Sequence, residues 1–239
     1  MNRVPKRGRG SDPNQEGRDR WLAQVLAAVP AGWRLLDAGA GELKNKALCT
    51  HLKYVSQDVC QYEGKGDAQG LQTGTWDTSQ IDLVCDIVQI PEPDASFDVI
   101  LCSEVFEHLP DPLKALKEFW RLLKPGGRLI VTAPFASLVH FAPHHYATGF
   151  SRYWYQHHLP KGNFEILELT ANGDWFSYLE QEIRRLPGMA RRYRDWRWPL
   201  AYLLVWMTGM YFGLREKSQR SEDVACFGWH CVAVKMGSQ

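Results

Sequence analysis

The sequence predicts an α/β protein built on a doubly wound, mostly parallel sheet with helices on both faces. Apolar runs of strand length alternate with segments whose apolar residues recur at helical spacing. Alternation of this kind is typical of a parallel sheet that helices cover on both sides. In addition, acidic side chains and glycines directly follow several of the predicted strands, at the edge where such sheets bind their ligands.

Seven segments have the pattern of buried strands. Between two of them, the stretch 61–80 contains mainly Gly, Thr, Gln and Asp without clear periodicity. A helix is usual at this place in a doubly wound sheet, but the composition predicts a loop. The predicted strands lie at 33–37, 52–57, 81–86, 97–102, 128–132, 164–169 and 224–235.

Three helices are expected in the first half of the chain. Residues 18–29 carry Trp, Leu and Val at helical spacing, and Pro30 ends this helix. A second helix is expected at 43–50. Residues 113–123 form a clean apolar helical face, and a Lys-Pro-Gly-Gly stop closes this helix before the next strand.

Charge is unevenly distributed along the 239 residues. The 28 Lys and Arg residues nearly balance the 27 Asp and Glu residues, so the chain is not basic throughout. Residues 1–17 and 184–217 are nevertheless basic, while the remaining body is acidic. The first segment is polar with scattered Gly and Pro, which predicts a disordered basic tail before a single domain at 18–239. An anionic partner is expected to meet the basic segments rather than the body.

The cysteines and the N-terminus indicate a reducing compartment. None of the six cysteines forms a C-x-x-C pair or has a histidine at zinc spacing, and two of them lie in predicted strands, where cysteine behaves as a small apolar residue. The N-terminal residues are basic but lack the apolar segment of a secretory signal. We therefore expect a cytoplasmic protein.

The ends of the predicted strands carry the residue types of a ligand site. Asp37 precedes Ala-Gly-Ala-Gly, in which Gly39 and Gly41 let the main chain approach a ligand closely. A dinucleotide-binding turn needs a third glycine at position 44, where this chain has Lys44. An acid directly before the glycines also repels phosphate. The turn therefore favours a cationic or hydroxyl-rich ligand over a pyrophosphate.

Several motifs stand together in a familiar order. They are L-L-D-A-G-A-G-E at 35–42, Asp58 at the end of the second strand, V-C-D-I at 84–87, S-F-D-V-I-L-C-S-E-V-F-E-H-L at 96–109 and R-L-L-K-P-G-G-R-L at 121–129. This pattern resembles the class I S-adenosylmethionine-dependent methyltransferases of the type 11 kind. The resemblance implies a Rossmann-like, seven-stranded sheet whose last strand is antiparallel, and S-adenosyl-L-methionine as cofactor. With no helix evident after strand two, a loop is expected to cover the adenine side of the pocket.

The resemblance also implies how the cofactor is held. Asp58 would accept both ribose hydroxyls, and Asp86 would accept the adenine amino group. The methionine end would lie against Asp37, the glycine main chain and the end of the fourth strand. For Asp37 and Asp58, capping of main-chain amides at the strand end is the alternative role. The expected cofactor-binding residues are Asp37, Gly39, Gly41, Asp58, Asp86, Ile87, Cys102, Ser103 and Glu104.

The acceptor of the methyl group is expected to meet a histidine-rich loop. Transfer to a hydroxyl needs a base that removes its proton, and histidine suits this task near neutral pH. Residues 134–160 follow the fifth strand, where the family usually places acceptor-binding loops, and they contain five histidines. We select His144 and His145, which precede a tyrosine, together with His108 as catalytic candidates. The alternative is a solvated aromatic loop whose histidines have no chemical role.

Glu104, Glu107 and His108 form an E-x-x-E-H motif. On a helix, offsets of three and four residues place these side chains on one side. Together with a later histidine they could hold a hard divalent ion, as in the small-RNA 2′-O-methyltransferases and some quinone-pathway O-methyltransferases, which this stretch resembles. The interpretation we favour is that Glu107 and His108 only stabilise the start of the helix, so no metal is predicted.

A basic and then apolar stretch lies within an expected helical insertion at about 171–217. Six arginines at 184–197 alternate with aromatic residues, and 199–214 then contains no charged residue. A membrane-spanning helix needs about 20 apolar residues, so this stretch is short. We expect a buried cap helix over the acceptor pocket. The alternatives for 184–214 are a helix at a membrane surface and nucleic-acid binding, which is disfavoured because no RNA-binding module is recognisable.

These observations predict a methyltransferase that acts on a small molecule. The expected acceptor atom is an oxygen of a sugar, lipid-linked or quinone-like compound. An RNA methyltransferase and a non-catalytic cofactor-binding protein on the same fold are the alternatives. The acids at positions 37, 58 and 86 argue against the non-catalytic protein. The sequence indicates a cytoplasmic location, with peripheral membrane contact as an alternative, and makes no prediction of oligomeric state.

Overall fold

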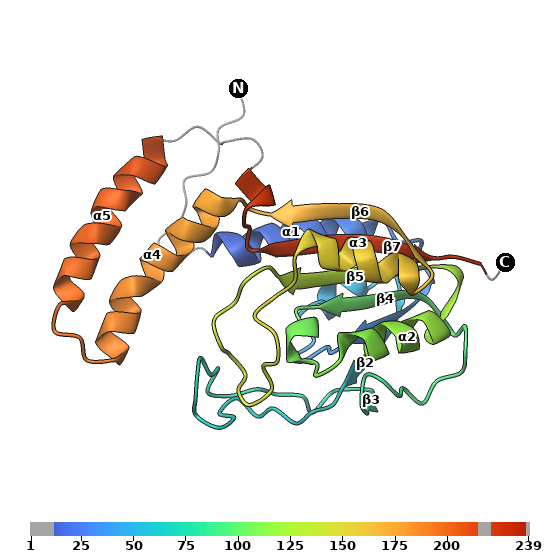
Figure 1. The fold of residues 1–239 in the computed structure, drawn as a ribbon. Coiled ribbons are helices and arrows are strands. Elements are labelled where there is room, and N and C mark those ends of the chain that lie inside the picture. The colour runs from blue at the N-terminus through green and yellow to red at the C-terminus, as the bar shows by residue number, and fades with distance from the viewer. Residues whose placement is uncertain (1–11, 215–220, 238–239) are drawn as a thin grey trace.

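The computed structural model describes residues 12–214 and 221–237 and contains one seven-stranded sheet (Figure 1). The strand order is β3-β2-β1-β4-β5-β7-β6, and β7 runs antiparallel to its neighbours β5 and β6 while the other pairs are parallel. This arrangement confirms the predicted fold class. The strands are β1 (Arg34–Ala38), β2 (Lys53–Asp58), β3 (Leu83–Val84), β4 (Phe97–Ser103), β5 (Leu123–Pro134), β6 (Phe164–Asn172) and β7 (Gly228–Lys235).

Helices cover both faces of the sheet. On β4, Val99 and Leu101 pack with α1 while Ile100 and Cys102 pack with α2 and α3, which is the alternation expected of a strand buried on both sides. The helices are α1 (Pro13–Ala27), α2 (Pro112–Leu122), α3 (Arg152–Lys161), α4 (Trp175–Arg192) and α5 (Trp198–Leu214), with short 3₁₀ helices η1 (Lys46–Cys49), η2 (Phe106–His108) and η3 (Ser221–Asp223).

The first helix begins earlier than the sequence pattern predicts. The side chain of Asp12 accepts hydrogen bonds from the amides of Asn14 and Gln15, and Pro13 occupies the first helical position. Both features favour a helix start. The prediction of a disordered tail is therefore wrong for residues 13–17. The rest of that prediction, for residues 1–11, lies outside the described residues.

Of two other local predictions, one fails and one is confirmed only in part. The helix expected at 43–50 is reduced to η1, and Leu43 cannot belong to a helix because its φ of 58° lies in the left-handed region. The third strand keeps only two paired residues. Directly before this strand in the chain, the side chain of Asp82 accepts hydrogen bonds from the amide and the hydroxyl of Ser56, at 2.8 and 2.7 Å. This contact replaces main-chain pairing with β2 at that position.

The helical insertion does not cap the pocket. Helices α4 and α5 pack against each other as a hairpin that projects from the end of the sheet (Figure 1). Within α5 only Ala201 is buried, while Trp206 is 64% exposed and Leu214 86%. The prediction of a buried cap helix is therefore wrong. Because α5 is apolar on all sides and α4 covers only one of these sides, the remaining apolar side chains of α5 stay exposed.

No helix within residues 12–214 and 221–237 combines the length and apolar character that crossing a membrane requires.

Candidate active site

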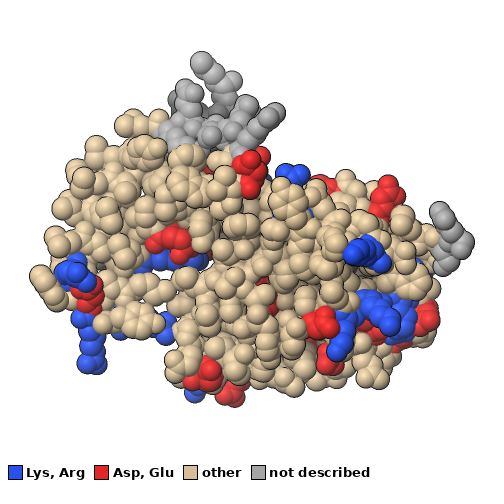
Figure 2. All heavy atoms as spheres, in the orientation of Figure 1, with Lys and Arg blue, Asp and Glu red and all other residues tan. Residues whose placement is uncertain are grey.

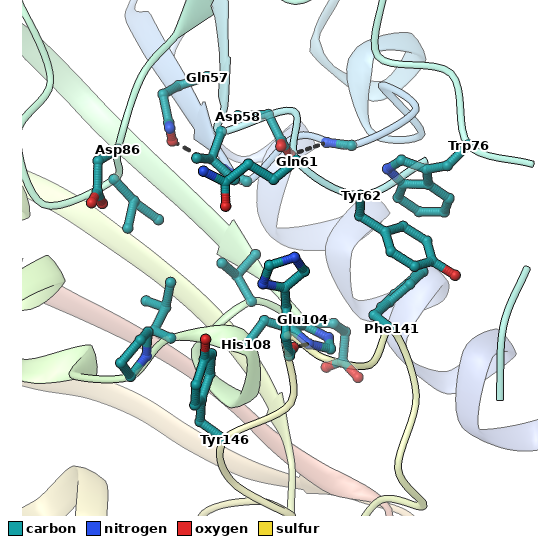
Figure 3. Close-up of a pocket in the computed structure, with 18 residues that line it drawn as sticks. Gln57, Asp58, Gln61, Tyr62, Trp76, Asp86, Glu104, His108, Phe141 and Tyr146 are labelled. Carbon is teal, nitrogen blue, oxygen red and sulfur yellow. Dashed lines mark hydrogen bonds between the residues drawn. The ribbon is translucent and has the colours of Figure 1, made fainter. Parts of the chain in front are cut away.

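A pocket of about 300 Å³ opens at the carboxyl ends of β1, β2 and β4 (Figure 3). This is the place where open α/β sheets bind ligands, and its size lies at the lower end of the range for small-molecule sites. It is lined by Gly39, Gly41, Gln57, Asp58, Val59, Gln61, Tyr62, Trp76, Asp86, Ile87, Glu104, Val105, His108, Leu109, Pro110, Phe141, His144 and Tyr146.

The glycine turn after β1 forms one wall of this pocket from main chain alone. Gly39 and Gly41 have φ values of 75° and 52°, which disfavour other residues. A Cβ atom on Gly39 would lie 2.5 Å from the side chain of Val105, and one on Gly41 would lie 2.6 Å from the ring of Trp76. Both positions therefore need glycine, and the predicted close approach of main chain and ligand is available here.

Asp58 lies at the end of β2 and faces the pocket (Figure 3). Its Oδ2 accepts a hydrogen bond from the amide of Gly41 at 3.0 Å, and its Oδ1 accepts one from the amide of Cys60 at 2.8 Å. A carboxylate has about four acceptor positions, so each oxygen retains capacity for a further donor. The geometry thus combines both predicted roles, capping of the turn and an acceptor site for hydroxyl groups.

The other predicted cofactor residues divide into two groups. Asp86, Ile87 and Glu104 line the pocket. Cys102 and Ser103 are not among its lining residues, because Cys102 is fully buried in the sheet core and Ser103 shares a hydrogen bond with the hydroxyl of Thr132. The end of β4 therefore contributes Glu104 to the pocket, and the two residues before it have structural roles.

Asp37 lies behind the glycine turn and does not line the pocket. Its carboxylate is 1% exposed and accepts a hydrogen bond from the hydroxyl of Tyr54 at 2.6 Å. Burial raises its pKa to about 6, against the lowering effect of the hydrogen bonds from Tyr54 and Asn45. In this geometry the side chain of Asp37 does not reach the pocket, so it does not offer the expected direct contact with the methionine part of the cofactor. Asp37 instead connects β1 to β2 and supports the turn from inside.

Two long loops cover the open side of the pocket. The amide of Leu71 donates to the carbonyl of Val139 at 2.8 Å, and the amide of Phe141 donates to the carbonyl of Leu71 at 3.2 Å. Their aromatic rings also meet, with the Phe141 ring centroid 4.4 Å from that of Tyr62 and 5.0 Å from that of Trp76 (Figure 3). The prediction of a loop at 61–80 is confirmed, whereas the aromatic cluster that it forms with Phe141 was not predicted.

The three catalytic candidates occupy different positions. His144 and His108 line the pocket, whereas His145 lies behind them with both ring nitrogens buried. His108 Nδ1 is 2.5 Å from the carbonyl oxygen of His144, and because a carbonyl only accepts, Nδ1 carries the proton. Burial lowers the pKa of His108 to about 4, so its ring is neutral at physiological pH.

The acceptor loop is shorter than predicted. It ends at Ser151, where α3 begins, so only part of the expected 134–160 segment is loop. Tyr155 and Leu159 of α3 are buried in the core. His157 and His158 therefore belong to a helix on the sheet and do not line the pocket.

Comparisons with known proteins agree with this architecture. Residues 36–131 match the family model described as a methyltransferase domain. A ubiquinone biosynthesis O-methyltransferase of Xylella fastidiosa is 31% identical over 183 residues, which cover 74% of this chain and 71% of that protein. A demethylmenaquinone methyltransferase of Deinococcus radiodurans is 33% identical over 106 residues, but the match covers only 39% of that protein and 43% of this chain.

Solved structures show the same fold at low sequence identity. The cyclase SpnF superimposes with a TM-score of 0.58 at 19% identity, over 96% of this chain and 86% of that one. A Burkholderia thailandensis 1,6-didemethyltoxoflavin-N1-methyltransferase, solved with S-adenosylhomocysteine bound, has a TM-score of 0.55 at 14% identity, over 94% of this chain and 84% of that one.

The chain belongs to the class I S-adenosylmethionine-dependent methyltransferases. It is accordingly an enzyme, and S-adenosylmethionine is its cofactor. The pocket fits this group, because the glycine turn admits close approach and Asp58 presents unused acceptor positions beside it. Gly39, Gly41, Asp58, Asp86 and Ile87 are the residues that would hold the cofactor.

The buried carboxyl of Asp37 predicts a pH-dependent stability. Because its pKa rises from 3.8 on folding to about 6, the folded state holds more protons than the unfolded state between these values. The free energy of unfolding therefore falls as the pH rises through this window. Asp37→Asn, which removes the titrating group, should be more stable than the parent protein at pH 7 by an amount on the order of 2 kcal/mol, and the advantage should vanish near pH 4.

Urea unfolding of both proteins at a series of pH values measures this difference. Asp19→Asn, on the exposed side of α1, is the matched control for the loss of one carboxylate. A difference between Asp37→Asn and the parent that stays constant from pH 4 to 7 would contradict the assignment.

The position of Asp58 in the pocket predicts that its replacement lowers the affinity for the cofactor. Asp58→Ala should weaken binding of S-adenosylmethionine or S-adenosylhomocysteine by roughly 1.5–3 kcal/mol, because charge-assisted hydrogen bonds to the cofactor are lost. Isothermal titration calorimetry measures the affinity, with Asp19→Ala as the control. Unchanged affinity in Asp58→Ala would remove this residue from the cofactor site.

Proposed function

We propose that the enzyme transfers a methyl group to a hydroxyl oxygen of a quinone-like aromatic acceptor. The observation that carries this proposal is the wall formed by Tyr62, Trp76 and Phe141 in the same cavity as the glycine turn and His144. Aromatic walls suit a flat, apolar ring, while the histidine supplies a polar contact for its hydroxyl group. The similarity to a ubiquinone biosynthesis O-methyltransferase supports the same class of acceptor.

The residues around the cavity suit a displacement at a methyl carbon. When bound, the cofactor would supply a methyl group activated by a sulfonium sulfur, for displacement by the acceptor oxygen with a neutral thioether as the leaving group. The side chain of His144 accepts the hydroxyl proton and passes it to solvent, to which it is partly exposed. The two loops over the pocket exclude water and align the acceptor.

A panel of acceptors tests this proposal directly. The purified enzyme is supplied with radiolabelled S-adenosylmethionine and a hydroxylated benzoquinol, a sugar, an amine or total RNA. We expect label only in the benzoquinol, recovered in the organic phase and unaffected by ribonuclease. Label in RNA or in the sugar, with none in the benzoquinol, would overturn the proposed acceptor.

His144→Ala should separate chemistry from cofactor binding. A positioned base typically contributes at least about 100-fold to the rate, so kcat should fall by about that factor or more. The affinity for S-adenosylhomocysteine should stay the same, because His144 lies on the acceptor loop and the cofactor residues lie at the strand ends. His157→Ala, on the exposed surface of α3, is the control and should keep full activity. Equal losses of turnover and cofactor affinity would instead indicate that the loop has collapsed.

We also propose that helix α5 holds the enzyme at the surface of an anionic membrane. Trp206, Met207 and Met210 are among its exposed apolar side chains, and α5 contains no charged residue. In Figure 2 the end of the molecule formed by the hairpin is mostly free of charge, with charged side chains at its lower edge. The arginines at the end of α4 lie next to it, and Arg191 stacks on the ring of Trp198 at 4.9 Å. Large exposed apolar patches mark sites of contact with proteins or membranes, and basic residues beside such a patch are attracted to anionic lipids.

Vesicle sedimentation tests this contact. The protein should sediment with vesicles of equal parts phosphatidylglycerol and phosphatidylcholine, and added salt should weaken the binding. Each arginine near such a surface contributes about 1 kcal/mol, so changing Arg191, Arg192 and Arg194 together to Ala should weaken binding on the order of 100-fold. Lys114→Ala with Lys117→Ala, on the exposed face of α2, should have little effect. Binding that is insensitive to salt and to the arginine changes would contradict the proposal.

A further inference from the structure

Three histidines converge beside the pocket. His108 comes from η2, and His140 and His145 come from the loop that follows β5. One ring nitrogen from each lies within 4.8 Å of one nitrogen of each of the others. The rings are close as well, with centroids of His108 and His140 4.7 Å apart and those of His140 and His145 5.0 Å apart. The cluster therefore brings together three atoms of the kind that bind metal ions.

Main-chain hydrogen bonds orient two of these rings. His108 Nδ1 donates to the carbonyl of His144, and His140 Nδ1 donates to the carbonyl of Leu138 at 2.9 Å. Each ring therefore carries its lone pair on Nε2. Metal-binding histidines are commonly oriented in this way, by donating the second ring N–H to a main-chain carbonyl. His145 has both ring nitrogens buried without a hydrogen-bond partner among the described residues.

A buried carboxylate lies next to the same nitrogens. Glu107 is 1% exposed, and neither of its carboxylate oxygens has a hydrogen-bond partner within the described part of the chain. Its Oε1 lies 3.7 Å from His108 Nε2 and 4.0 Å from His140 Nε2. Burying a carboxylate with no partner is costly, so a cation between it and the imidazoles would satisfy the group. This is a second, independent feature that points to a bound ion.

We propose that His108, His140, His145 and Glu107 form a binding site for a divalent transition-metal ion, best suited to Zn²⁺. Three imidazoles and one carboxylate are a common ligand set for zinc, with Zn–N distances of about 2.0–2.1 Å. In a tetrahedral site of this size the ligand nitrogens stand about 3.3 Å apart. The nitrogens of the cluster therefore need to approach by at most about 1.5 Å, which small side-chain rotations supply.

This site differs from one that the E-x-x-E-H motif alone would form. Glu104, the first acid of the motif, makes an ion pair with Arg18 at 2.8 Å and accepts a hydrogen bond from Thr132 at 3.0 Å. Both of its oxygens are thus engaged elsewhere. The remaining set is dominated by nitrogen, whereas magnesium prefers oxygen ligands and retained water. The ion is therefore of the zinc type, and Glu104 is outside its ligand set.

The proposed ion would join two parts of the pocket wall. His108 and Glu107 belong to η2, next to the end of β4, while the other two ligands belong to the loop that carries Phe141, His144 and Tyr146. Four protein ligands are typical of a structural zinc site. Binding therefore holds the acceptor loop over the pocket. The metal site does not depend on the identity of the acceptor.

Metal binding is measured on the full chain, purified without a metal-affinity tag and treated with a chelator. Competition with a chromogenic chelator should show one Zn²⁺ site per chain, and Co²⁺ should give the visible absorption of a four-coordinate nitrogen and oxygen site. His140→Ala and His145→Gln should each weaken Zn²⁺ binding by roughly 100-fold or more, since even loss of an outer partner of a ligand costs about 10–100-fold. Glu104→Gln and His157→Ala should bind Zn²⁺ as the parent does.

The outcomes separate this proposal from its competitors. A chain without a saturable Zn²⁺ site would overturn it, and so would unchanged affinity in both His140→Ala and His145→Gln. Binding of Mg²⁺ that is lost in Glu104→Gln would replace it with the hard-ion site of the motif. Circular dichroism checks that each variant is folded. If His140→Ala does not fold, the volume-conserving His145→Gln still tests the site. Because no acceptor is present, these results stand apart from the test of the proposed function.

Discussion

Hydrogen bonds between the glycine turn after β1 and the end of β2 determine the shape of the pocket. The amides of Gly39 and Ala40 both donate to the carbonyl of Gln57, at 2.8 and 2.9 Å, and the amide of Gly41 donates to Asp58. These bonds require β1 and β2 to be parallel neighbours in the observed register. Because the turn residues contribute only their amides to these bonds, the cavity opens directly onto the main chain, and the strand-end acids stand around it.

Much of the fold could be predicted because each strand of a parallel sheet is buried on both faces and therefore has a run of apolar residues in the sequence. The start of α1 was readable in principle, since Asp12 and Pro13 are a capping residue and a favoured first residue. Other differences between the predicted and the observed elements could not be predicted from the sequence. The left-handed conformation of Leu43 carries no sequence signal, and α3 lacks a clear periodicity because histidines and Pro160 interrupt its apolar face, although Tyr155 is fully buried.

For the site, prediction succeeded where topology alone brings residues together. The carboxyl ends of parallel neighbours meet at one edge, so Asp58, Asp86 and the glycines could be grouped before any contact was known. The aromatic wall could not be, because Tyr62 and Phe141 belong to two loops without periodicity that meet only through tertiary hydrogen bonds. The same holds for the association of Glu107 with His140, which is set by the path of the acceptor loop.

The cover of the pocket is continuous from η2 to the projecting hairpin. The main-chain carbonyl of Glu107 accepts hydrogen bonds from the amides of Tyr146 and Ala147, which tie the acceptor loop to η2. That loop pairs with the loop between β2 and β3, and the carbonyl of Gly70 in the latter accepts a hydrogen bond from Arg192 at the end of α4. The exposed helix α5 is thus connected, through α4 and two paired loops, to the aromatic wall that we propose for the acceptor. The insertion does not cap the pocket itself, but a ligand or surface bound to α5 and a change in the pocket wall would act on the two ends of one continuous set of contacts.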